Sequence, residues 1–332
     1  GILVLGLFLL GAAPERLGPA ERGYIAALTA IAAASDAVQL VLGIGLAAII
    51  VIGGLIFRRR LHLRLPALAL LVTPIAIAAL GHVAVNATAG RGPVIAPTAP
   101  FSMLAGMIRD GTAQAYLAAH CPERRFQLCD RIAELRREPE NFSADPLRLA
   151  PRGEDGQSWR DEARSIVAGV LRTYPAWQAG KVAEHTLRQL FVVDIDWLML
   201  RRPAEQWVGR YIRDHFPAEY PLYLGGRQGT ARLSVDAVSM WHGFGAIVGA
   251  TLSTFLFLEF ARRGDRVMTM LFAIIAAALL ANALLTGGLT QVEGRNQSRV
   301  IWLAILYAAI ATQYFRLCSA AEAPGRDFVS PR

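Results

Sequence analysis

Long runs of apolar residues, broken by short stretches rich in arginine, dominate the pattern of the chain. A helix needs roughly 20 mostly apolar residues to cross about 30 Å of membrane hydrocarbon. Runs of about that length with almost no charged residue predict an all-α, polytopic membrane protein. They cover residues 40–57, 65–89, 243–260, 267–289 and 300–317.

Two apolar stretches near the start of the chain are too short to cross a membrane by themselves. Residues 1–13 are expected to end a helix that begins before the first residue, and they lack the basic start of a signal peptide. Residues 24–34 are expected to form a tilted half-crossing that meets the next apolar run at a break over Ser35 and Asp36. This places Asp36 at or near the far face of the membrane.

The arginines between the runs predict the orientation of the chain. The short loops 58–64 and 261–266 carry four and three arginines, so the positive-inside rule places both in the cytoplasm. The intervening segment 91–241 and the loop 290–299 then lie outside. The predicted division is 1–90 and 242–317 as membrane helices, 91–241 as a mostly helical extracytoplasmic domain, and 318–332 as a cytoplasmic tail.

The segment 91–241 has the amphipathic pattern of a helical domain rather than that of a linker. Apolar residues recur at helical spacing in four stretches, and 183–200 is apolar enough to lie along the membrane surface. Breaks are predicted at 139–156 and 217–229. The four stretches are 103–120, 165–171, 183–200 and 204–216.

Cys121 and Cys129 lie in this segment, and they can pair if it faces an oxidising compartment. A continuous helix would hold them about 12 Å apart, which is too far for a disulfide, but Pro122 can break the helix. The alternative is a metal site with His120, which lacks the closely spaced ligand pairs of such sites. We predict the disulfide, and no metal or other cofactor.

Composition agrees with a membrane location. The chain is 54% hydrophobic and 18% charged, against about 25% charged for soluble domains. The net charge of +8 does not indicate nucleic-acid binding, because the arginines gather at the ends of apolar runs. Lys181 is the single lysine among 34 basic residues, which is typical of codon usage in high-GC bacteria.

The most suggestive polar stretch is QVEGRNQSRVIW, residues 291–302, between two predicted spans on the outer side. Arg295 and Arg299 suit the phosphate of a lipid, because a guanidinium fork matches phosphate oxygens. Asn296 adds a polar group, and Glu293 is placed to orient an arginine. The alternative is a solvated hairpin whose arginines reach the lipid headgroups.

Other polar residues lie in apolar surroundings. Asp36 is a lone acid between apolar runs, which makes it a functional candidate. His82 and Asn86, one helical turn apart, would either line a polar cavity or cap the helix where it leaves the membrane. Asp194 and Asp196 would share a face on a strand as a carboxylate pair, or would lie at the solvated edge of an interfacial helix.

The chain resembles a group of polytopic inner-membrane proteins of high-GC proteobacteria. The resemblance is carried by the Ser35–Asp36 break, FSMLAGMIRDGTAQAYLAAHCP at 101–122, Tyr174–Pro175, and RNQSRVIW at 295–302. That group in turn is distantly similar to membrane glycosyltransferases of the GT-C type. This resemblance implies a polyprenyl-phosphate sugar donor on the outer face, with its phosphate on Arg295 and Arg299. The catalytic acid that it implies, in a first outer loop, would precede this chain.

Two hypotheses follow, and the sequence leaves open whether the protein is an enzyme. In the first, the protein is a GT-C-like glycosyltransferase of the bacterial inner membrane, with membrane lipids and polyprenyl phosphate as partners. In the second, it is a non-catalytic assembly subunit whose periplasmic domain, residues 91–241, docks a membrane-protein partner. A transporter is disfavoured, because charged residues within the spans are nearly absent.

Overall fold

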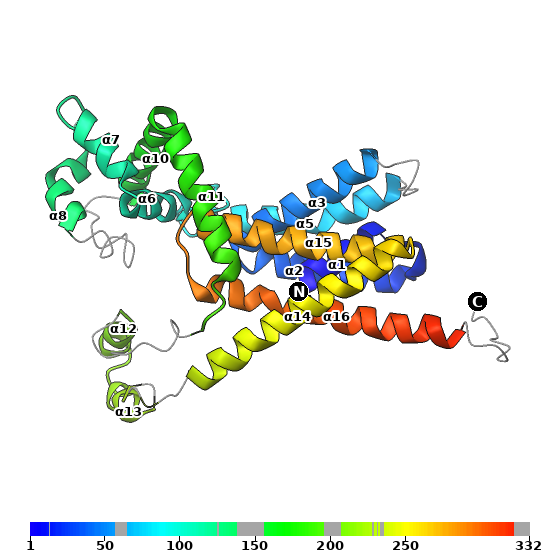
Figure 1. Cartoon of the computed structure of the whole chain (residues 1–332). Helices are drawn as coiled ribbons and strands as arrows, with labels where there is room; N and C mark the ends of the chain where they lie inside the picture. The colour runs from blue at the N-terminus through cyan, green and yellow to red at the C-terminus, as the bar shows by residue number, and fades with distance from the viewer. Residues whose placement is uncertain are drawn as a thin grey trace. The chain divides into compact units, whose positions relative to one another are not determined.

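The computed structural model describes the chain except for residues 13, 57–64, 125, 138–155, 196–206, 228, 231, 233–235 and 322–332. Every regular element in the described ranges is a helix, and these ranges contain no strand (Figure 1). The predicted all-α fold class is confirmed. The predicted cytoplasmic loop 58–64 lies outside the described residues.

Four helices are long and apolar enough to cross a membrane, and they correspond to four of the five predicted runs. They are α5 (Leu65–Thr88), α14 (Asp236–Arg262), α15 (Arg266–Ala283) with its π-helical continuation Leu284–Gly288, and α16 (Gly294–Ala321). The remaining run, residues 40–57, forms α3 (Ala37–Ile56). Its apolar part, Ala37–Gly53, is shorter than the four candidate spans. The chain therefore has the helices of an integral membrane protein.

Contacts divide the chain into two compact units. The first comprises Gly1–Leu190 and Ala277–Val292, and the second comprises Phe191–Ala276 and Glu293–Arg332. Each unit is described by itself. The predicted boundaries at residues 90, 241 and 317 separate membrane helices from segments on either side of a membrane. The two contact-based units do not bear on this division, so the boundaries stay predictions.

The first unit begins with four helices that pack side by side (Figure 1). They are α1 (Ile2–Ala12), α2 (Pro19–Ala34), α3 and α5, and a 3-10 turn at Pro14–Arg16 joins the first two. Helix α2 begins five residues earlier than the apolar pattern predicts. Pro19 suits a first helical position, and Glu21 accepts a 2.7 Å hydrogen bond from the Gly18 amide.

A small helical domain follows α5 in the same unit. It contains α6 (Ala99–Arg109), α7 (Thr112–His120), a 3-10 turn at Gln127–Arg131, α8 (Ile132–Arg137), α10 (Gly156–Thr173) and α11 (Pro175–Phe191). The predicted continuous stretch 103–120 is split, because Gly111 adopts a φ of 81° that ends α6 and begins α7. Apolar residues of α6, α7 and α10 form its core around Trp159, which is fully buried.

Two further predictions for this region are wrong. The predicted helix 183–200 stops at Phe191, and Val192–Ile195 is not helical. The predicted break at 217–229 contains a short helix, α13 (Tyr220–Gly225), because Pro221 fits the first turn of a helix. The amphipathic stretch 204–216 forms α12 (Trp207–His215).

In the second unit, α14 and α16 pack closely. A Cβ atom built on Gly249 would lie 2.5 Å from Ile305 Cγ1, so only glycine permits this approach. Ser253 Oγ donates a 2.5 Å hydrogen bond to the carbonyl of Ala304 on the facing helix. Small and hydroxyl residues at such contacts are typical of helix pairs in membranes.

Candidate functional site

The predicted loop 290–299 is largely helical, which corrects the sequence analysis. Helix α16 begins at Gly294, so Arg295, Asn296 and Arg299 occupy its first two turns. Glu293 immediately precedes the helix, where its negative charge offsets the positive end of the helix dipole and the two arginines. Gly, Asn and Ser in this stretch resemble a turn in sequence, which explains the wrong prediction.

Arg295 and Arg299 are exposed and four residues apart, so they lie on one face of α16. The Arg295 Nε lies 2.5 Å from the Glu293 carboxylate, whose side chain is only 8% exposed. The nearly buried carboxylate thus fixes one edge of an exposed guanidinium. One turn after Arg299, Trp302 donates a 2.9 Å hydrogen bond from Nε1 to the Arg299 carbonyl oxygen.

The structure brings Asp194 to this helix start from a distant part of the sequence. A Cβ atom built on Gly294 would overlap the Asp194 carbonyl oxygen and lie 2.5 Å from its Oδ1. The Ile195 amide donates a 3.3 Å hydrogen bond to Ser239 Oγ on α14, which holds the segment in place. Asp194 is therefore half-buried against Gly294, the first residue of α16, on a segment that is neither strand nor helix. Asp196 lies outside the described residues.

Two of the remaining polar candidates, Asp36 and Asn86, make hydrogen bonds to the backbone. Asp36 Oδ1 accepts a 3.2 Å hydrogen bond from the Val38 amide and so caps α3. Asn86 is buried, and its Nδ2 donates to the carbonyls of Val94 and Ile95 at 2.8 and 3.2 Å. Asn86 thus ties the chain that leaves α5 to the end of the helix.

His82 lies one turn before Asn86 and is half-buried. Its Nε2 is buried without a hydrogen-bond partner among the described residues. Both interpretations of His82, the cavity and the helix cap, stay predictions.

Cys121 and Cys129 form a disulfide, as the sequence predicts. Helix α7 ends at His120, and the turn that follows brings the two Cα atoms to 5.6 Å. The His120 ring stacks on Tyr116, and its Nδ1 lies 2.9 Å from the Tyr116 carbonyl oxygen. No cluster of three metal-ligating side chains occurs among the residues that the structure describes.

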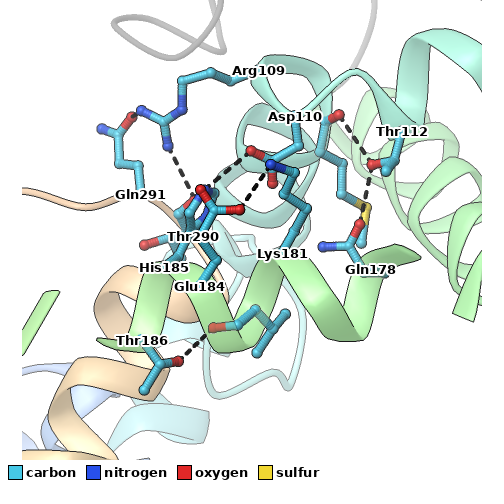
Figure 2. A network of polar contacts seen from close by, with 12 residues as sticks. Arg109, Asp110, Thr112, Gln178, Lys181, Glu184, His185, Thr186, Thr290 and Gln291 are labelled. Atoms are coloured by element: carbon cyan, nitrogen blue, oxygen red, sulfur yellow. Dashed lines mark hydrogen bonds and ion pairs between the residues drawn. The ribbon is translucent and has the colours of Figure 1, made fainter. Parts of the chain in front are cut away.

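Sequence analysis missed a cluster of polar residues in the first unit, where α6 meets α7, α11 and the chain after α15 (Figure 2). His185 Nε2 lies 3.3 Å from Asp110 Oδ1, and the two side chains are 12% and 8% exposed. Burial raises the pKa of Asp110, although the charges of His185, Arg109 and Lys181 act in the opposite direction. A carboxylate and an imidazole at this distance can share a proton.

Four other contacts surround this pair in Figure 2. The Arg109 guanidinium donates to Gln291 Oε1 at 3.1 Å and to the Thr290 carbonyl oxygen at 3.4 Å. Thr112 Oγ1 donates to Gln178 Oε1 at 3.1 Å. Lys181 pairs with Glu184 at 2.9 Å.

Positions 178, 182, 185, 186 and 189 lie on one face of α11, and four of the five carry polar side chains. This spacing was the only sequence signal for the cluster. Spacing alone does not say that these face inward. The interior partners, Asp110 and Thr112, are about 70 residues earlier in the chain and become neighbours only in the fold.

Comparisons with family models, curated proteins and solved structures find no match for the chain. The resemblance to inner-membrane proteins and to GT-C enzymes therefore rests on the motifs quoted above.

Proposed function

We propose that the start of α16 binds the phosphate of a polyprenyl-phosphate lipid at the outer face of the bacterial inner membrane. In this proposal, residues 91–241 lie in the periplasm and the protein is a group transferase of the GT-C-like kind. The observation that carries the proposal is the placement of exposed Arg295 and Arg299 in the first two turns of a candidate span, whose first residue, Gly294, contacts Asp194.

The geometry supports phosphate binding in three ways. Two guanidinium groups on one face present paired donors that suit phosphate oxygens. Glu293 holds the Nε edge of Arg295, which reduces the freedom that the side chain would lose on binding. The positive end of the α16 dipole, which Glu293 offsets in part, lies close to the same place.

Asp194 supplies a candidate for the base that transfer requires. Its carboxylate would take the proton of an acceptor hydroxyl. The oxygen of that hydroxyl would then form a bond to the carbon of the sugar that the polyprenyl phosphate carries. The bond between that carbon and the phosphate oxygen breaks at the same time, and the lipid phosphate leaves with the electron pair. Arg295 and Arg299 would stabilise the developing charge on the leaving phosphate.

Binding of polyprenyl phosphate to the purified protein in nanodiscs tests the proposal. We expect Arg295→Ala with Arg299→Ala to weaken binding by about 10- to 100-fold, because each loses charge-assisted hydrogen bonds to phosphate. Asp194→Asn should bind nearly as tightly but lose transfer activity. Arg316→Ala is the matched control, since Arg316 is exposed at the opposite end of the same helix.

An equal loss in Arg316→Ala and in the double variant would show non-specific charge attraction and would overturn the proposal. Unchanged binding in the double variant would do so directly. The alternative of an assembly subunit stays a prediction; purification of the protein with a stoichiometric membrane partner would favour it.

A further inference from the structure

Helix α11 buries polar residues and exposes apolar ones, which is the reverse of its neighbour α10. Helix α10 has the pattern of a soluble domain, with Trp159 and Ile166 buried and Asp161 and Arg164 exposed. In α11, three polar residues are buried: Gln178, Thr186 and Gln189.

The exposed side of α11 carries an apolar stripe. Ala176, Gly180, Ala183 and Leu187 are exposed and follow helical spacing, and the Leu187 residue is 60% exposed. Trp177, at the edge of the stripe, is 43% exposed. Water is a poor environment for such a stripe, so its surroundings need an explanation.

Contacts on the polar side hold α11 in this orientation. Gln178 accepts a hydrogen bond from Thr112, and His185 pairs with Asp110, as Figure 2 shows. A Cβ atom built on Gly287 would lie 2.7 Å from Gln189 Cγ, so the Gln189 side chain of α11 packs directly against the backbone of Gly287. The helix cannot turn its apolar stripe inward without breaking these contacts.

The same contacts locate α11 at the end of a candidate span. Gly287, against Gln189, and Gly288, against Thr186, are the last residues of the span Arg266–Gly288. The other end of that span follows Arg262 and Arg263, which the positive-inside rule places in the cytoplasm. The Gly288 end is therefore the outer one, consistent with a disulfide in the same unit.

We propose that α11 lies in the outer interfacial zone of the lipid bilayer, with its apolar stripe against acyl chains. Lipid fits because α11 adjoins the outer end of a span, and because its charged edge suits a headgroup layer. That edge carries the paired Lys181 and Glu184, followed by exposed Arg188. The long basic side chains can extend to lipid phosphates while the stripe stays in the hydrocarbon.

Spin labels on the full chain in phospholipid nanodiscs test this. Single cysteines replace Ala183 and Leu187 on the stripe, Glu184 on the charged edge, and Arg164 on α10 as the matched control, all in a Cys318→Ser background. We expect the labels at 183 and 187 to be several-fold more accessible to oxygen, relative to a water-soluble nickel complex, than those at 184 and 164. Oxygen concentrates in acyl chains and the nickel complex in water.

Two stripe positions guard against a single variant that misfolds, and retention of the Cys121–Cys129 disulfide confirms that the domain is intact. Nickel accessibility at 183 and 187 equal to that at 164 would place the stripe in water and overturn the proposal. Labels inaccessible to both reagents would show a protein partner over the stripe, and would overturn it equally.

Discussion

At the residue scale, Asp110 is the described carboxyl group with the clearest cost of burial. Loss of hydration disfavours its ionised form, and the nearby positive charges of His185, Arg109 and Lys181 offset this only in part. The folded protein therefore holds a proton on Asp110 more tightly than the unfolded chain does. In this respect the pair with His185 fixes α11 at the expense of some stability near neutral pH.

Asp110→Asn tests this through the pH dependence of stability. In the wild type, the contribution of Asp110 to the free energy of unfolding falls as pH rises from its ordinary pKa of 3.8 through its raised pKa. The variant lacks this decline, so its stability relative to wild type should increase as pH rises above about 4. Thermal unfolding followed by circular dichroism measures the difference.

Asp161→Asn provides the control, because Asp161 is 60% exposed and pairs with Arg164 at the surface of the same domain. We expect no comparable trend for it. A difference between Asp110→Asn and wild type that stays constant or shrinks with rising pH would contradict the interpretation of Asp110.

At the element scale, the contact between α14 and α16 depends on one glycine. Gly249→Ala should destabilise the protein by about 1–3 kcal/mol, because the added Cβ would displace Ile305 and separate the helices. Gly243→Ala on the same helix is the matched control, since open space surrounds Gly243.

Helix propensity alone makes Gly243→Ala neutral or stabilising by up to about 1 kcal/mol. Denaturation in detergent, followed by circular dichroism, compares the two variants. Equal stability of both would show that the close approach at Gly249 contributes nothing.

The same scale shows what the sequence could predict. Apolar runs near 20 residues have few alternatives to a membrane helix, so α5, α14, α15 and α16 were predictable to within a few residues at most ends. The start of α16 was not, because Gly294 and Asn296 favour turns as readily as a first helical turn. Continuous contacts along the helix, rather than local preference, decide such ends.

The candidate site was only partly predictable for a related reason. Glu293, Arg295 and Arg299 stand close together in sequence, and their charge was visible. Asp194 joins them through packing against Gly294, a contact between residues about 100 positions apart that no local pattern encodes. The polar residues of α11 were visible too, but ordinary amphipathic reasoning would place them outward.

At the scale of the whole molecule, the arginine distribution and the cysteines independently predict which side of the membrane each segment lies on. The positive-inside rule places the small helical domain outside and the end of α16 inside. The disulfide indicates an oxidising compartment for the domain. The one free cysteine in the described part of the chain, Cys318, lies at the end of the α16 span. The positive-inside rule predicts that its thiol lies on the opposite side of the membrane.

These positions give a complete test of topology with the natural cysteines. In intact spheroplasts, a membrane-impermeant maleimide should label the protein only after an impermeant reductant opens the Cys121–Cys129 disulfide. Cys318 should react only once the membrane is permeabilised, and Cys318→Ser should abolish that second labelling while leaving the first. Labelling of Cys318 in intact spheroplasts would mean that α16 runs the other way. Arg295 and Arg299 would then face the cytoplasm, where a lipid-linked donor for outer-face transfer is out of their reach.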